Sequence, residues 1–188
     1  MNAPVRLQTQ QQIKLRMQDF FAIDEAGALA GYGRTELIDG SIYTVAPQHR
    51  PHARLKMHLA SAAQEALRAA GSSLFVFAEV TVAMPPYDAP LPDIVISDDP
   101  EGDGAVPLAS VALIAEVSST TLEDDLGAKR RLYALQGVPE YWVADLASRT
   151  MHRMWEPSGE DYARSDRLSL DDRICSATIT GLEIDLPA

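Results

Sequence analysis

The segment 111–145 constrains the fold of this chain more than any other stretch. It reads VALIAEVSSTTLEDDLGAKRRLYALQGVPEYWVAD, which predicts an apolar strand, a Ser/Thr corner, a helix and a second apolar strand. Successive side chains of a strand alternate between its faces, so Glu116 shares a face with Ile114. A lone carboxylate buried there costs several kcal/mol. The fold must therefore supply a cation, a hydrogen-bond network or a metal beside Glu116.

The other segments predict a mixed β-sheet flanked by α-helices. Asp39-Gly40 is a strong signal for a hairpin turn, and Gly71 marks the end of a helix. The expected elements are a helix over 13–23, a hairpin over 35–45, a helix over 52–70, strands over 74–82 and 93–97, the central unit 111–145, a hairpin of 151–155 with 162–168, and a last strand over 174–186. This order predicts an α/β fold with a C-terminal β-hairpin extension.

The chain has 188 residues, which is the length of one domain with a substantial core. We expect a flexible polar tail over 1–12 and a single domain over 13–188. Cys175 is the only cysteine, which excludes a disulfide framework and a cysteine-based zinc site. No apolar run has transmembrane length and no signal-type core is present, so a cytoplasmic protein without membrane contact is expected.

The net charge of −11 opposes tight binding of nucleic acid by bulk electrostatics. A phosphate-bearing substrate would need a local basic strip or divalent cations. Basic residues cluster modestly at two places, Arg50, Arg54 and Lys56 in one and Lys129, Arg130 and Arg131 in the other. Each cluster is predicted to be a solvated helix face, and together they could form such a strip only if both lay beside the acidic edge of the sheet.

Asp93 opens one apolar strand and Glu116 closes the next. If these strands are antiparallel neighbours, the two carboxylates meet at one edge of the sheet, where they repel each other unless a cation lies between them. Hard oxygen ligands suit Mg²⁺ or Mn²⁺. The alternative is that Asp93 caps a turn beside Pro92 while Glu116 pairs with an arginine, and for either residue alone this alternative is favoured.

Lys129 lies four residues after Asp125 on the predicted helix, with Tyr133 one turn further. The spacing alone favours a weak ion pair on a solvated face. In the second interpretation, Lys129 leans over the sheet edge toward Glu116, where an ammonium could orient an attacking water or stabilise an oxyanion.

His52, at a predicted helix start, could be a packing or capping residue; the alternative, that it reaches a phosphate or a metal-bound water, is implied only by the family resemblance that the ordered motifs carry. The other three histidines, His49, His58 and His152, are expected to lie at the surface or to pack against neighbours. The sequence shows no histidine pair with a third ligand, so a zinc hydrolase is not expected.

Several short motifs occur in a characteristic order. They are ELIDG at 36–40, Pro47 followed by His52-Ala53, Pro92-Asp93, Glu116-Val117-Ser118, D-x-x-x-K-x-x-x-Y at 125–133 and GVPEYW at 137–142. From about residue 20 to 186 the chain resembles the Uma-type restriction endonuclease family, a branch of the PD-(D/E)XK nuclease superfamily. The resemblance implies a restriction-endonuclease-like fold, a DNA substrate and a homodimer.

The resemblance also implies the site. Asp93, Glu116 and the Val117 carbonyl would bind Mg²⁺ or Mn²⁺, and Glu36 would hold a metal-bound water or a second metal. The superfamily usually has a lysine two residues after the acidic ligand, but this chain has Ser118 there. The resemblance implies that Lys129 supplies the ammonium instead.

The sequence leaves three hypotheses for the function of this protein. The first is a metal-dependent endonuclease that hydrolyses phosphodiester bonds in DNA through Glu36, Asp93, Glu116, Lys129 and His52. The second is a non-catalytic nuclease-fold protein that binds nucleic acid or a partner protein, which Ser118 and the net charge favour. The third is a hydrolase of smaller phosphoesters, which a narrow, closed pocket would favour.

Overall fold

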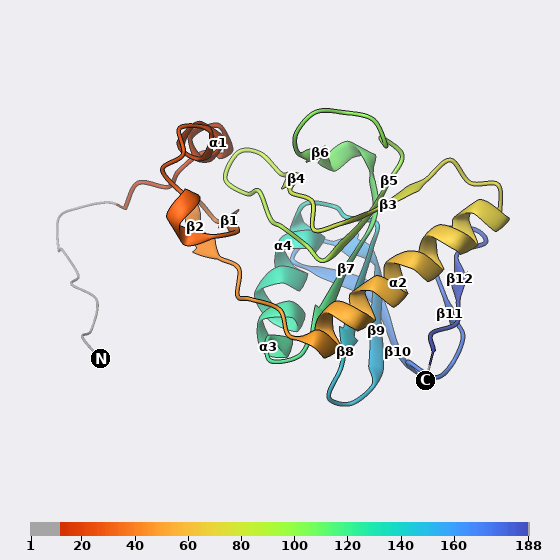
Figure 1. Cartoon of the computed structure of the whole chain (residues 1–188). Helices are drawn as coiled ribbons and strands as arrows, with labels where there is room; N and C mark the ends of the chain where they lie inside the picture. Colours follow the sequence, from red (N-terminus) through yellow and green to blue (C-terminus); the bar gives the residue numbers. More distant parts are fainter. Residues whose placement is uncertain (1–11, 188) are drawn as a thin grey trace.

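A six-stranded mixed sheet forms the centre of the computed structural model, which describes residues 12–187 (Figure 1). The expected tail over 1–12 lies outside the described residues except for Gln12. Along the sheet the strands are β10 (Asp161–Ser169), β9 (Thr150–Ser158), β8 (Glu140–Asp145), β7 (Val111–Ser118), β5 (Ile94–Ser97) and β3 (Phe75–Ala78). Only β7 and β8 are parallel neighbours; the other pairs are antiparallel. The predicted mixed sheet is confirmed.

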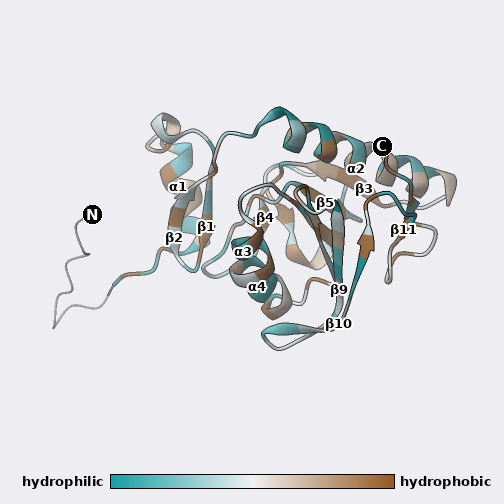
Figure 2. Cartoon of the chain, turned by 90° about the horizontal axis from the view of Figure 1, so that it is seen from below, coloured by the Kyte–Doolittle hydropathy of each residue, from teal (hydrophilic) through white to brown (hydrophobic). Residues whose placement is uncertain are grey.

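Helices cover both faces of this sheet (Figure 2). On one face lies α2 (Arg50–Ala69), which buries Leu59, Ala63 and Leu67. On the other face lies a continuous helical segment made of α3 (Leu122–Asp124), a π-helical turn (Asp125–Lys129) and α4 (Arg130–Leu135). Among the described residues no helix has both the length and the apolar character needed to cross a membrane.

Strand β7 separates the two cores as its alternation predicts. Leu113, Ala115 and Val117 belong to the core under α2, whereas Ile114 belongs to the core under α4. The central unit 111–145 therefore folds as expected, with a strand, a helical segment and a parallel return strand. This crossover places the helix carrying Lys129 above the face of β7 to which Glu116 points.

The hairpin β1 (Thr35–Ile38) and β2 (Ser41–Thr44) forms around Asp39 and Gly40 as predicted. Both turn residues have positive φ, 49° and 73°, which is the requirement of a tight two-residue hairpin turn. The hairpin packs with α1 (Met17–Glu25) around Leu37 and Phe20.

Three expected elements differ from the structure. The first helix begins at Met17 and not at residue 13, because the N–H of Leu15 in the preceding segment donates to the Gly40 carbonyl. The strand predicted over 74–82 ends at Ala78, because Glu79 has a φ of 55° and turns the chain. The chain then forms β4 (Val82–Ala83), which pairs with β6 (Val106–Pro107) after a long loop.

The last predicted strand, 174–186, is also wrong. It is a small antiparallel pair, β11 (Ile174–Cys175) and β12 (Glu183–Ile184), joined by a loop. Two short 3-10 helices, Ala30–Tyr32 and Leu108–Ser110, complete the described elements.

Candidate active site

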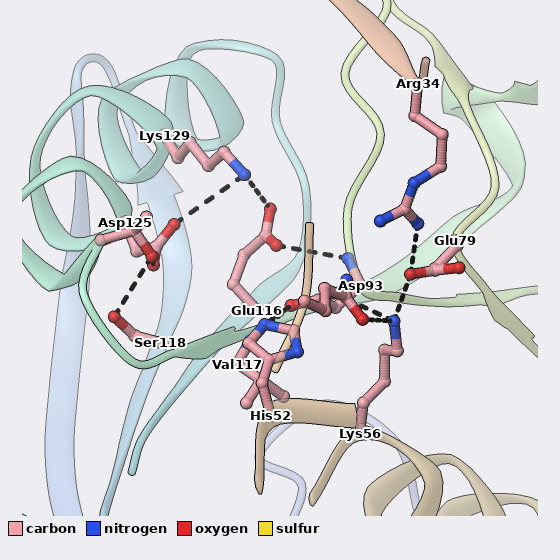
Figure 3. Close-up of polar contacts among 12 residues, drawn as sticks. Arg34, His52, Lys56, Glu79, Asp93, Glu116, Val117, Ser118, Asp125 and Lys129 are labelled. Carbon is pink, nitrogen blue, oxygen red and sulfur yellow. Dashed lines mark hydrogen bonds and ion pairs between the residues drawn. The ribbon is translucent and has the colours of Figure 1, made fainter. Parts of the chain in front are cut away.

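Asp93 and Glu116 lie together at one edge of the sheet (Figure 3). Strands β5 and β7 pair antiparallel with Ile94 opposite Ala115, so the residue before β5 lies beside the end of β7. The Val117 N–H donates to Asp93 Oδ2 at 2.9 Å, and the Asp93 N–H donates to Glu116 Oε2 at 3.2 Å. The two residues are 8% and 3% exposed. The two strands are antiparallel neighbours, which is the condition under which the sequence brings the two carboxylates together.

Lys129 points into the site rather than to solvent. Its Nζ is 2.9 Å from Glu116 Oε1 and 3.8 Å from Asp125 Oδ1. The Tyr133 hydroxyl donates to the same Glu116 oxygen at 2.9 Å. The geometry therefore agrees with the second interpretation, in which the ammonium leans toward Glu116, and the weak surface pair favoured by the spacing alone is wrong.

Ser118, which stands at the superfamily's usual lysine position, is fully buried. Its hydroxyl lies 3.4 Å from Thr121 Oγ1, and Thr121 donates to Asp125 Oδ2 at 2.6 Å. These short side chains fix the corner between β7 and the helical segment. The ammonium of the site is instead that of Lys129, in the helical segment that follows β7.

Asp93 is held from the α2 side by side chains that the sequence did not single out together. His52 Nε2 is 3.1 Å from Asp93 Oδ2, and Gln48 Nε2 donates to Asp93 Oδ1 at 3.0 Å. Lys56 Nζ is 3.6 Å from Asp93 Oδ1 and also contacts Gln48 and Glu79. His52 thus contacts the carboxylate through one ring nitrogen, while its buried Nδ1 has no hydrogen-bond partner among the described residues.

The expected exposure of Lys56 on a solvated basic face is wrong. Lys56 is 6% exposed, and its ammonium lies between the carboxylates of Asp93 and Glu79. Arg34 from the start of the β1 region pairs with the same Glu79. The i,i+4 spacing from His52 was the signal that could have placed Lys56 on the site face of α2. Sequence offered no comparable signal for Gln48 or Glu79.

The second basic cluster does not form a nucleic-acid strip either. Lys129 is occupied by Glu116, while Arg130 and Arg131 pair with Asp161 and Glu160 of the C-terminal hairpin. A basic strip was predicted only if both clusters lay beside the acidic edge, and Arg130 and Arg131 do not meet that condition.

Burial governs the proton affinities in this corner. Burial raises the pKa of Glu116 to about 7; the neighbouring charges of Asp93 and Asp125 also raise it, and Lys129 opposes the shift. Burial alone would raise the pKa of Asp93, but the contacts from His52 and the Val117 N–H hold it below its usual value. Burial would lower the pKa of Lys129, but the surrounding carboxylates, Glu116 foremost, raise it. Lys129 is thus an ammonium at neutral pH, and Glu116 titrates near neutrality.

Glu36 lines the same cleft but makes a different contact. Its Oε2 accepts the Leu91 N–H at 3.1 Å. Within residues 12–187 no three His, Cys, Asp or Glu side chains form a group that could hold a metal, so Glu36 does not join Asp93 and Glu116 in a ready-made set. The two converging carboxylates and the adjacent Val117 carbonyl are hard oxygen donors, whose chemistry fits Mg²⁺ or Mn²⁺.

The site opens into a cleft of about 550 Å³. One wall is formed by the β1–β2 hairpin and the loop 45–49, and the other by the corner after β7 with the start of the helical segment. Asp93 and Glu116 lie at its floor, and Lys129 enters from the helical wall.

The structure is a mixed sheet between two helical layers. Two carboxylates lie at the ends of neighbouring antiparallel strands, and an ammonium from a helix pairs with one of these carboxylates. This arrangement defines a protein of the restriction-endonuclease-like fold class. The chain belongs to the Uma2 family, described as "putative restriction endonuclease", whose model matches residues 17–187. No curated protein matches the chain.

A solved structure supports the fold independently. It is described as "a putative nuclease belonging to DUF820" from Anabaena variabilis ATCC 29413, and it is similar to this chain with a TM-score of 0.58 at 15% sequence identity. The similarity covers 76% of this chain and 80% of that chain. The predicted family resemblance and fold class are confirmed.

Proposed function

We propose that this protein is a metal-dependent endonuclease that hydrolyses phosphodiester bonds in DNA. Family membership supports a nuclease role, and one observation carries the catalytic assignment: Lys129 Nζ lies 2.9 Å from Glu116, on the strand next to Asp93. A half-buried ammonium held by a buried carboxylate at a cleft floor is positioned to act on a bound phosphate. An ion pair with a purely structural role would not need to line an open cleft, as Glu116 and Lys129 do.

Asp93, Glu116 and the Val117 carbonyl are the proposed ligands of Mg²⁺ or Mn²⁺. When bound, such a cation supplies Lewis-acid activation of the phosphate and of the attacking water. His52 and Lys56 hold the Asp93 carboxylate ionised and fixed in direction, and the Tyr133 hydroxyl fixes the direction of the Glu116 carboxyl group. These supporting contacts keep both carboxylates in the orientation that a ligand pair needs.

Lys129 is proposed to orient the water and to stabilise negative charge that develops on the phosphate oxygens. Glu36, across the cleft, is proposed to hold a further water or cation. His52 has a contact with Asp93, so its proposed role is to position that ligand. The predicted homodimer stays a proposal, which sedimentation equilibrium of the purified protein would check.

Cleavage of supercoiled plasmid and of single-stranded circular DNA with Mg²⁺ or Mn²⁺ tests the proposal. The wild-type protein should convert either substrate, and Asp93→Ala should lower the rate by about 100-fold or more, because loss of the outer-shell support of a metal ligand alone costs about 10–100-fold. Lys129→Met should also reduce cleavage while leaving Mn²⁺ binding measurable by calorimetry. Equal cleavage by wild type and Asp93→Ala would overturn the assigned site. Absence of cleavage by a wild type that binds DNA would favour the non-catalytic alternative.

A further inference from the structure

Tyr43 presents an uncovered aromatic ring beside the candidate site. It lies on β2, is 53% exposed and lines the cleft that contains Asp93 and Glu116. Its partner in the antiparallel register is Glu36, and directly opposed residues of an antiparallel pair point to the same face. The ring therefore stands next to a proposed catalytic acid, with no core residue covering it.

The side of the cleft that carries Tyr43 has several apolar residues among polar ones such as Glu36 and Gln48, whereas the floor is charged. The apolar residues on this side are Ile38, Val45, Ala46, Pro47 and Leu91. An exposed apolar surface next to buried charges marks a place where a ligand covers it. The occupant therefore needs an apolar, flat part for the wall and, under the proposed function, an anionic part for the divalent cation that Asp93 and Glu116 would hold at the floor.

The depth of the acids limits the form of this occupant. Asp93 and Glu116 are 8% and 3% exposed, so a phosphate must enter the cleft to reach them. A volume of about 550 Å³ lies in the range of pockets that enclose one ligand of small-molecule size, which fits a nucleotide unit. In an intact duplex the bases are stacked inside, so no base face is free to cover the apolar wall.

The charge of the cleft also opposes the binding of a duplex. Six carboxylates line it, against two permanent cations, Arg34 and Lys129, both already in ion pairs. A duplex is held without base contacts by many phosphate contacts to basic side chains, and this cleft lacks them. Proteins that bind single strands usually combine a basic groove with stacking, but the stacking of one base on an aromatic ring by itself contributes about 1–3 kcal/mol.

We propose that the cleft binds an unpaired nucleotide of single-stranded DNA, with its base stacked on Tyr43 and its phosphate directed to the floor formed by Asp93 and Glu116. This inference rests on the proposed function, because it names the form of DNA that reaches the same site. A frayed end, a loop or a single strand is then bound in preference to continuous duplex.

Fluorescence anisotropy with a labelled oligonucleotide tests the proposal without turnover, in Ca²⁺ instead of Mg²⁺. The single strand and a blunt hairpin duplex of the same sequence are compared for wild type, Tyr43→Phe and Tyr43→Ala. Single-strand affinity should exceed duplex affinity, fall about 10-fold or more in Tyr43→Ala, and be retained in Tyr43→Phe, which keeps the ring. Tyr32→Ala, which removes an aromatic ring that is 66% exposed and does not line the cleft, is the matched control and should bind like wild type.

Three results would overturn the inference: duplex affinity equal to or above single-strand affinity, unchanged single-strand affinity in Tyr43→Ala, or an equal loss in Tyr32→Ala. Because Tyr43 is exposed, thermal unfolding of the variant should match wild type, which separates loss of binding from loss of fold. If wild type cleaves DNA but prefers duplex, this inference fails while the endonuclease proposal stands. If it binds single strands through Tyr43 without cleaving any DNA, the endonuclease proposal fails and the binding surface stands.

Discussion

Glu116 shows how one buried side chain links stability to the chemistry of the site. It is 3% exposed and accepts hydrogen bonds from Lys129, Tyr133 and the Asp93 N–H. Burial and the nearby carboxylates nevertheless raise its pKa to about 7. The ionised form, which a cation ligand must adopt, is thus the form that the folded protein disfavours when no cation is bound.

The pH dependence of stability should report this conflict. A carboxyl group whose folded pKa is raised binds more protons in the folded than in the unfolded state, so stability falls as pH rises from its ordinary pKa of 4.5 through about 7. The shift corresponds to about 3 kcal/mol. Glu116→Gln should flatten this part of the profile, measured by urea unfolding between pH 4.5 and 8 in EDTA. The exposed variant Glu123→Gln is the control, and an unchanged slope in Glu116→Gln would contradict the raised pKa.

Lys56 is a second residue whose effect should be measurable by itself. Its buried ammonium contacts Glu79, Gln48 and Asp93, so Lys56→Met leaves the buried Asp93 and the half-buried Glu79 and Gln48 without their cation. Removing one partner of a buried ion pair costs about 3–5 kcal/mol, and the retained Arg34–Glu79 pair places the expected loss at the lower end. Thermal or urea unfolding checks the value. Arg68→Met on the exposed side of the same helix should change stability by no more than about 0.5 kcal/mol.

At the scale of elements, the start of β8 fixes the C-terminal segment. Glu140 is fully buried and accepts hydrogen bonds from Trp142 Nε1 at 2.6 Å, Ser176 Oγ at 2.6 Å and Thr178 Oγ1 at 2.7 Å. The backbone N–H groups of Ala177 and Thr178 donate to it as well. This carboxylate draws the chain out of the strand geometry expected over 174–186, which explains why β11 and β12 are short and separated.

Glu140→Ala should release this segment. Several buried donors lose a charged acceptor together, so we expect a loss of about 3 kcal/mol or more in the free energy of unfolding. Hydrogen exchange should show lost protection at 177–179, while β7 remains protected. Glu65→Ala, on the exposed face of α2, should leave both measurements unchanged. Retained protection at 177–179 in Glu140→Ala would show that other contacts hold the segment.

At the scale of the whole molecule, the charge of −11 governs the approach of DNA. Lys56 of the first basic cluster and all three residues of the second cluster pair with acidic side chains, while Arg50 and Arg54 are exposed, so the protein itself provides only a small basic surface for a polyanion. A divalent cation at the cleft floor would offset this field locally.

DNA affinity should therefore depend on a divalent cation. Binding of single-stranded DNA should be tighter in Ca²⁺ than in EDTA at matched ionic strength, and Asp93→Ala should abolish the difference. Fluorescence anisotropy titrations of wild type and Asp93→Ala, each in Ca²⁺ and in EDTA, measure these affinities. Equal affinity in Ca²⁺ and EDTA for wild type would show that DNA binds without a cation at this site.

Sequence patterns determined the local structure and the central pair of acids. The two-residue alternation in 111–118 assigned Glu116 to its face, the Asp39-Gly40 turn located the hairpin, and the order of motifs identified the family. The alternation and the turn depend on residues that are close together in the sequence, and the order of the motifs can be read directly along the chain. The meeting of Asp93 and Glu116 was predicted only on the condition that their strands are antiparallel neighbours, and the structure meets that condition.

Only the tertiary structure decided which polar side chains are buried and which partners they have. Lys56 has the sequence surroundings of an exposed helical lysine, but Glu79, 23 residues later, and Asp93 make it a buried cation. Likewise, Lys129 has a local partner at i−4, yet its closer contact is Glu116, 13 residues earlier on another element. Burial of a charge depends on compensation from segments far apart in the chain, and local periodicity carries no information about that compensation.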